Sequence, residues 1–130
     1  MTRDEIVRYW IDSANQDYQV MESLFANGHY VWSLFVGHLV VEKLLKAYHV
    51  KKADADYPRT HNLLRIAQGA ALELTDDQRL LLDEVTAFNI RARYPDYKNR
   101  FGNTANQEFT QQYIEKIRGF RQWLSKEMTR

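Results

Sequence analysis

The segment from Tyr30 to Tyr48 reads YVWSLFVGHLVVEKLLKAY. If it is helical, its apolar residues cover most of the circumference of the helix, and a helix of this kind usually lies at the centre of a protein core. The apolar run from Val31 to Val41 is far shorter than the roughly 20 residues that cross a bilayer. We therefore expect a buried central helix here and no membrane span.

The few polar residues of this segment form one stripe. His38, Glu42 and Lys46 follow one another at steps of four residues, so they share one face of the helix. If that face is exposed, Glu42 and Lys46 form an ion pair worth only about 0.3 to 0.5 kcal/mol. If a second copy or a partner covers the face, these groups line an interface or a cleft, where His38 could act as a general base or contact a phosphate.

Helical periodicity continues on both sides of the central segment. Three capping boxes predict helix starts, at Thr2 with Glu5, at Thr75 with Gln78 and at Thr104 with Gln107, and Thr60 is expected to cap a further short helix. Asn27 and Gly28 end the first helix, and Pro95 ends the helix that begins at Thr75 near Arg93. Residues 94–103 read as irregular.

The order of these segments predicts the fold class. No convincing strand pattern, fixed repeat or dividing linker is present in the 130 residues. We expect one all-α domain over residues 1–130, an up-and-down bundle of about five helices.

Composition narrows the classes of function. The chain has no cysteine, its net charge is +1, and its charged N-terminus lacks the apolar region of a signal peptide, so we expect a cytoplasmic protein whose basic sites are local. The four histidines lack the carboxylate spacing of zinc or di-metal sites, and phosphate-binding glycine loops are absent. We therefore expect no metal and no cofactor.

The segment with the strongest functional composition spans residues 91–101. It holds four cationic residues, three aromatic residues and one acid. Guanidinium groups bind phosphate with paired hydrogen bonds and aromatic rings stack on bases, so Arg91, Arg93, Tyr94 and Asp96 are candidate ligands of a nucleotide or a single-stranded nucleic acid. Alternatively, the two arginines stabilise the negative end of the preceding helix and the aromatic rings only cover the rim of the bundle.

A second cationic cluster surrounds Thr60. Arg59 and His61 flank this expected helix cap, a place where anions bind well. His61 is therefore a candidate ligand-binding residue, and its alternative role is simple packing at the start of the helix.

Three motifs together resemble the HEPN domain family, and the resemblance covers essentially the whole chain. They are the stretch His-x-x-x-Glu-Lys-x-x-Lys-Ala from His38 to Ala47, Thr-His-x-Leu from Thr60, and Arg-Tyr-Pro-Asp from Arg93. The resemblance implies a helical bundle that is usually a homodimer and is often encoded beside a minimal nucleotidyltransferase as its partner. Many relatives belong to toxin–antitoxin pairs.

The ribonuclease members of that family carry an Arg followed four to six residues later by a His, in a site assembled across the dimer. No Arg of this sequence has a His at that distance, because Arg59 precedes His61 by only two residues and no His follows Arg93. The residues of a catalytic site therefore stay unknown.

Three functional hypotheses remain open. The leading one is a non-catalytic module that binds a nucleotide or RNA and a nucleotidyltransferase partner. The second is a divergent ribonuclease toxin, in which His38 or His61 is the base and Arg93 stabilises the phosphorane. The third is a purely structural dimer.

Overall fold

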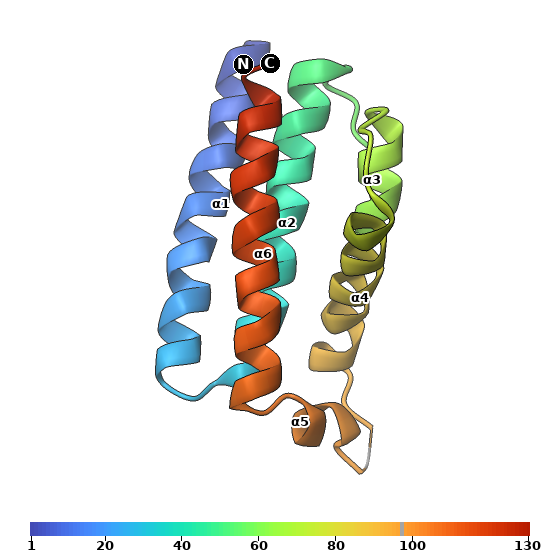
Figure 1. Cartoon of the computed structure of the whole chain (residues 1–130). Helices are drawn as coiled ribbons and strands as arrows, with labels where there is room; N and C mark the ends of the chain where they lie inside the picture. The colour runs from blue at the N-terminus through green and yellow to red at the C-terminus, as the bar shows by residue number, and fades with distance from the viewer. Residues whose placement is uncertain (97) are drawn as a thin grey trace.

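The computed structural model describes residues 1–96 and 98–130, and every regular element in them is a helix (Figure 1). Four long helices run alternately in opposite directions, and the two termini lie at the same end of the bundle. The prediction of an all-α, up-and-down bundle is confirmed. The six helices are α1 (Arg3–Ala26), α2 (Tyr30–Lys52), α3 (Leu63–Gly69), α4 (Asp76–Arg93), α5 (Arg100–Thr104) and α6 (Gln107–Met128).

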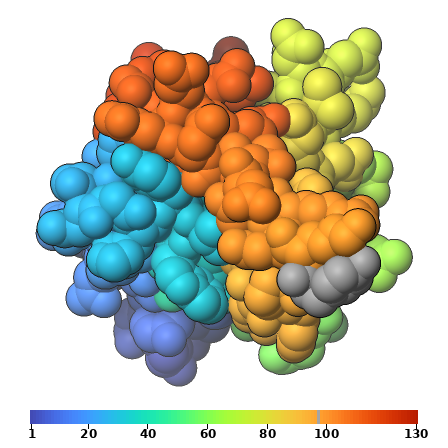
Figure 2. Space-filling view, turned by 90° about the horizontal axis from the view of Figure 1, so that it is seen from below, coloured from blue at the N-terminus to red at the C-terminus, as the bar shows by residue number. Residues whose placement is uncertain are grey.

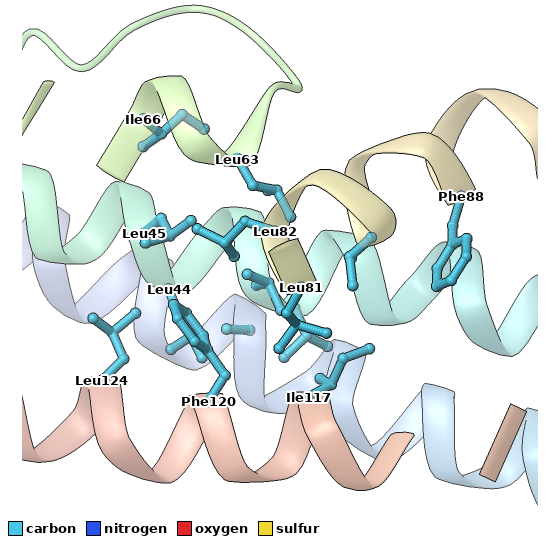
Figure 3. Packing of buried hydrophobic residues seen from close by; sticks show 14 of the residues in the cluster. Leu44, Leu45, Leu63, Ile66, Leu81, Leu82, Phe88, Ile117, Phe120 and Leu124 are labelled. Atoms are coloured by element: carbon cyan, nitrogen blue, oxygen red, sulfur yellow. The ribbon is translucent and has the colours of Figure 1, made fainter. Parts of the chain in front are cut away.

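Helix α2 is the central element, as its composition predicts. It packs against α1, α3, α4 and α6, and its buried residues lie on every side, including Leu34, Val41 and Leu45. Figure 3 shows Leu44 of α2 among apolar side chains of α4 and α6. None of the described helices has the length and apolarity that a bilayer crossing would require.

Three helices come close together at Gly37, near the middle of α2. A Cβ atom at this position would lie 2.8 Å from Cδ1 of Ile117 in α6 and 3.2 Å from Sδ of Met21 in α1. Both neighbours are fully buried, so they have little room to move. Glycine at position 37 therefore lets three helices meet at one level of the bundle.

Two of the predicted helix starts are confirmed and two are wrong. The side chains of Thr2 and Thr75 accept hydrogen bonds from backbone N–H groups in the first turns of α1 and α4. Helix α3, however, is capped by Asn62 and α6 by Asn106, each two residues beyond the expected threonine. Asparagine ranks above threonine as an N-terminal helix cap, which favours Asn62 and Asn106 over the expected threonines.

The segment expected to be irregular contains the short helix α5. Asn99 precedes it with φ of 50°, and the Asp96 carboxylate accepts a hydrogen bond from the backbone N–H of Arg100. Figure 2 views the bundle from the end that this segment covers. Tyr97, one of the three aromatic residues of the segment, lies outside the described residues.

Replacing Gly37 with valine is expected to destabilise the fold. The added methyl groups overlap Ile117 and Met21, and overpacking of this kind typically costs about 1–3 kcal/mol. Urea denaturation would measure the loss. The same residue introduced by Gln112→Val on the exposed side of α6 should change the free energy of unfolding far less, and equal effects of the two substitutions would contradict the packing at Gly37.

Candidate functional site

The polar stripe of α2 is buried, and Glu42 is its centre. Only 4% of Glu42 is exposed, yet both carboxylate oxygens are bonded. Oε1 accepts a hydrogen bond from Nδ1 of His61 at 2.7 Å, and Oε2 pairs with Nζ of Lys46 at 3.1 Å. A buried carboxylate is tolerated when its charge is paired in this way. We call His38, Glu42, Lys46 and His61 the Glu42 cluster.

The ammonium group of Lys46 is enclosed by aromatic rings as well as by the carboxylate. Its Nζ lies 4.9 Å from the ring centre of Trp10 and 5.2 Å from that of Tyr57. The Arg59 guanidinium lies over the same Tyr57 ring at 5.4 Å. Tyr57 therefore carries two cations, and cation–π attraction holds the connection between α2 and α3 against the bundle.

His38, one helical turn before Glu42 on α2, is fully buried. Its Nε2 donates a hydrogen bond to the backbone oxygen of His61 at 2.9 Å, because a carbonyl can only accept. Its Nδ1 is then the unprotonated ring atom, and it is buried without a hydrogen-bond partner. Burial lowers the pKa of His38 below the ordinary value of 6.5, so the ring is neutral at pH 7.

Both alternatives for the polar stripe need correction. The ion pair of Glu42 and Lys46 is not on an exposed face, and the face is covered by the chain itself at His61. The segment that contains His61 is also attached to the bundle at its end, because the backbone N–H of Leu63 donates to the Thr86 hydroxyl of α4. No second copy of the chain is needed to cover this face of α2.

A pocket of about 260 Å³ opens beside the cluster. His61 is exposed over 60% of its side chain, and its Nε2 is the free acceptor once Nδ1 donates to Glu42. The expected cap at Thr60 does not place His61 at a helix end, since α3 begins at Leu63. The pocket is lined by Lys46, Tyr57, Arg59, Thr60 and His61.

The end of α4 forms a second concave surface, which we call the α4 corner. A groove of about 210 Å³ is lined there by Arg91, Tyr94, Asp96, Arg100 and Phe101. Asp96 is paired with Arg100 at 3.2 Å, so the acid in the groove is already neutralised. The guanidinium of Arg91 lies 5.1 Å from the ring centre of Phe101.

Arg93 faces away from that groove and toward α2. Its guanidinium lies 5.8 Å from the ring centre of Phe35 and 5.4 Å from that of Tyr94, and its Nε donates to the backbone oxygen of Asn89. The charge of Arg93 also contributes to lowering the pKa of His38, after the larger effect of burial. Arg93 thus lies between the α4 corner and the Glu42 cluster.

The candidate residues therefore form two groups. Arg91, Tyr94 and Asp96 share one groove, whereas Lys46 and His61 line another pocket. Sequence reasoning missed Trp10, because its place in the apolar stripe of the first helix predicts core packing alone. It also missed Tyr57. The available signal was an aromatic residue next to a proline in a connection that is otherwise polar.

Metal binding has no support in the side chains that the structure describes. Within residues 1–96 and 98–130, no three histidine or acidic side chains gather in a way that could hold an ion.

The bundle, its buried α2 stripe and the arginine-rich end of α4 define a small all-helical domain. A family model described as the HEPN domain matches residues 7–128. The chain belongs to the HEPN domain family, as the three sequence motifs predict. No curated protein and no solved structure gives a match.

The neutral state of His38 predicts a pH dependence of stability. The pKa of His38 is lowered in the folded chain, so between the ordinary value of 6.5 and the lower folded value the unfolded chain binds a proton that the folded chain does not. Stability should therefore be full above about pH 6.5 and fall as the pH decreases below it.

Urea denaturation between pH 8 and 5 would measure this slope. His38→Gln, which keeps a donor for the carbonyl of His61, should flatten the slope. The matched substitution at the exposed His29 should leave it unchanged. A slope that survives His38→Gln would show that other groups cause it.

Proposed function

We propose that this HEPN protein is a binding subunit for a nucleotide or a short single-stranded RNA. One observation carries the proposal. Near the end of α4, neither Arg91 nor Arg93 has a carboxylate partner among the described residues, and both lie beside aromatic rings. Arg91 lines the surface groove, and Arg93 lies next to it on the side of α2. Unpaired guanidinium groups at an open surface are suited to phosphate.

Exposed aromatic rings next to these arginines would supply stacking. Tyr94 is 69% exposed and Trp32 of α2 is 49% exposed. Trp32 packs edge-to-face on Phe35, which in turn lies under Arg93, so the rings and the guanidinium form one continuous strip. Such strips bind bases with little sequence preference, at about 1–3 kcal/mol for each stacked base.

Asp96 and the Glu42 cluster have supporting roles in this proposal. Asp96 pairs with Arg100 and so fixes its guanidinium in the groove beside Arg91. In the pocket beside the Glu42 cluster, Arg59 and His61 would take a further phosphate, whereas Lys46 is held by Glu42 and aromatic rings. A ligand longer than one nucleotide could then use both pockets.

We further propose the partners that the family resemblance implies. The protein would act in the cytoplasm as a homodimer, paired with a minimal nucleotidyltransferase in a module of the toxin–antitoxin type. A neighbouring gene that encodes a small nucleotidyltransferase would support this pairing, and copurification of the two products would test it.

Removing the two unpaired arginines should weaken binding. Fluorescence anisotropy of labelled short RNAs, and calorimetry with nucleoside triphosphates, would measure affinity in low salt. Each lost phosphate contact removes roughly 0.7 from the slope of log affinity against log salt for a single strand, so Arg91→Ala with Arg93→Ala should flatten that slope as well.

Arg3→Ala with Arg8→Ala on α1 is the charge-matched control, since both arginines are exposed and lie on a different helix. Equal losses in the two double variants would remove the α4 corner from the site. Absence of binding to any of these probes would favour a purely structural dimer.

A second candidate function, metal-independent RNA cleavage, is favoured by one specific observation. The buried Glu42 carboxylate orients His61 so that Nε2 is the free acceptor on a mostly exposed ring. A carboxylate that fixes the tautomer of an exposed histidine is a common way to prepare a general base. His38 is poorly suited to this role, because it has no exposed surface.

Expression in bacteria would separate the two functions. If His61 is a base, the wild-type protein should arrest growth and degrade RNA, and His61→Gln should abolish both effects. His29→Gln is the control, since His29 is exposed and lies at the start of α2. RNA cleavage that His61→Gln leaves intact, or growth that the wild-type protein does not slow, would remove this candidate.

A further inference from the structure

The pocket beside the Glu42 cluster, which we call the His61 pocket, is suited to one small group rather than to a whole nucleotide. Its volume of about 260 Å³ lies below the roughly 300–1,000 Å³ that is typical of sites for drug-sized ligands. Three of its polar side chains come from consecutive residues, Arg59, Thr60 and His61. Their hydrogen-bonding capacity therefore decides which group the pocket takes.

Two of these side chains can donate to an anion. The Arg59 guanidinium lies over the Tyr57 ring at 5.4 Å and has no carboxylate partner among the described residues. The Thr60 hydroxyl oxygen accepts a hydrogen bond from the backbone N–H of Asn62, so its own hydrogen can be given to a ligand. An anion in the pocket can therefore accept hydrogen bonds from both side chains.

The third side chain, His61, presents an acceptor to the same space. Because a carboxylate can only accept, Nδ1 of His61 carries the hydrogen that bonds to Glu42 at 2.7 Å. In the neutral ring Nε2 therefore has a lone pair and no hydrogen, and the ring is mostly exposed. A fully ionised oxyanion brings only lone pairs to Nε2. This atom thus favours a ligand that carries a hydrogen of its own.

A phosphate monoester matches this mixture of donors and acceptor. Its second pKa is about 6, so near neutral pH it exchanges between a form with one O–H group and a form with none. The O–H group donates to Nε2 of His61, while the other oxygens accept from Arg59 and Thr60. If the proton moves to Nε2, the O–H bond breaks, an N–H bond forms and the total charge is unchanged. The buried Glu42 carboxylate stabilises the resulting imidazolium.

A phosphodiester inside an RNA chain lacks this hydrogen, because both of its unesterified oxygens are ionised or doubly bonded. We propose that the His61 pocket binds a terminal phosphate monoester and selects it over internal phosphodiesters. The inference rests on the proposed function and deepens it, since it names the group that this pocket recognises while the α4 corner binds the rest of the ligand.

Inorganic phosphate and sulfate separate the effect of the proton from that of charge, because sulfate carries two charges and no hydrogen at pH 7. NMR spectra of the histidine ring nitrogens in isotope-labelled protein, recorded at constant ionic strength, would measure both affinities. Phosphate should bind at least about tenfold more tightly, the effect expected of one hydrogen bond to a charged group. His61→Gln, which keeps a donor for Glu42, should bind the two ions equally, as followed by backbone amide signals.

Arg59→Ala should weaken the binding of both ions and keep the preference for phosphate, because a guanidinium donates to either ion. Arg65→Ala is the charge-matched control, since Arg65 is exposed on α3 and does not line the pocket. A wild-type chain that binds neither ion at His61, or binds sulfate as tightly as phosphate, would overturn the inference. So would a preference that persists in His61→Gln.

Synthetic RNAs of one sequence identify the source of the phosphate. They carry a 5′-phosphate, a 3′-phosphate, hydroxyl groups at both ends, or a 5′- or 3′-phosphate esterified with methanol. Fluorescence anisotropy should show that one of the two monophosphate ends binds at least about tenfold more tightly than the hydroxyl end. Methyl esterification of that phosphate should remove the gain. Equal affinity for all of these ends would overturn the inference.

The two sites can fail independently in this assay. Arg91→Ala with Arg93→Ala should weaken the binding of every RNA and keep the preference for the phosphorylated end. His61→Gln should remove the preference and keep the binding of the RNA with hydroxyl ends. Absence of RNA binding, with the preference of the wild-type chain for phosphate over sulfate intact, would count against the proposed function alone.

Discussion

The structure depends on how the chain neutralises Glu42. This carboxylate lies on the central helix and is almost fully buried, where an unpaired charge costs several kcal/mol. Lys46 supplies one partner from the same helix, and His61 supplies the other from the connection that follows. The need to pair Glu42 therefore fixes where that connection lies, and with it the position of α3 and the pocket beside His61.

The pairing of Glu42 also explains how the polar side chains around it are arranged. His38 is held as a neutral ring below the His61 backbone, while Lys46 lies among Trp10, Tyr57 and the carboxylate. Among the buried side-chain polar atoms of the described residues, Nδ1 of His38 and Oγ1 of Thr110 have no hydrogen-bond partner, whereas Asp17 Oδ2 is ion-paired with Lys43 at 2.7 Å. A connection without regular structure thus has a defined position because of electrostatics and aromatic packing.

Much of the fold follows from the sequence, since helical periodicity and an all-round apolar α2 are strong local signals. The candidate site is harder to predict from the sequence. The step of four residues places His38, Glu42 and Lys46 on one face, but it does not tell whether water, a partner or the chain itself covers that face. The partner of Glu42 is 19 residues away at His61, and such a long-range hydrogen bond leaves no local pattern. Asn62 and Asn106 cap α3 and α6 in place of the predicted threonines, and asparagine ranks above threonine as an N-terminal helix cap.

Both chain ends lie at the pole of the bundle opposite the short helix α5 (Figure 1). A protein fused to either end would therefore project away from the arginines at the end of α4. A linker between the two ends would stay at that pole, and new ends could be opened at the exposed residues 53–56 between α2 and α3 without cutting a long helix. The architecture thus suits a module that can be attached at one pole while the other stays open to solvent.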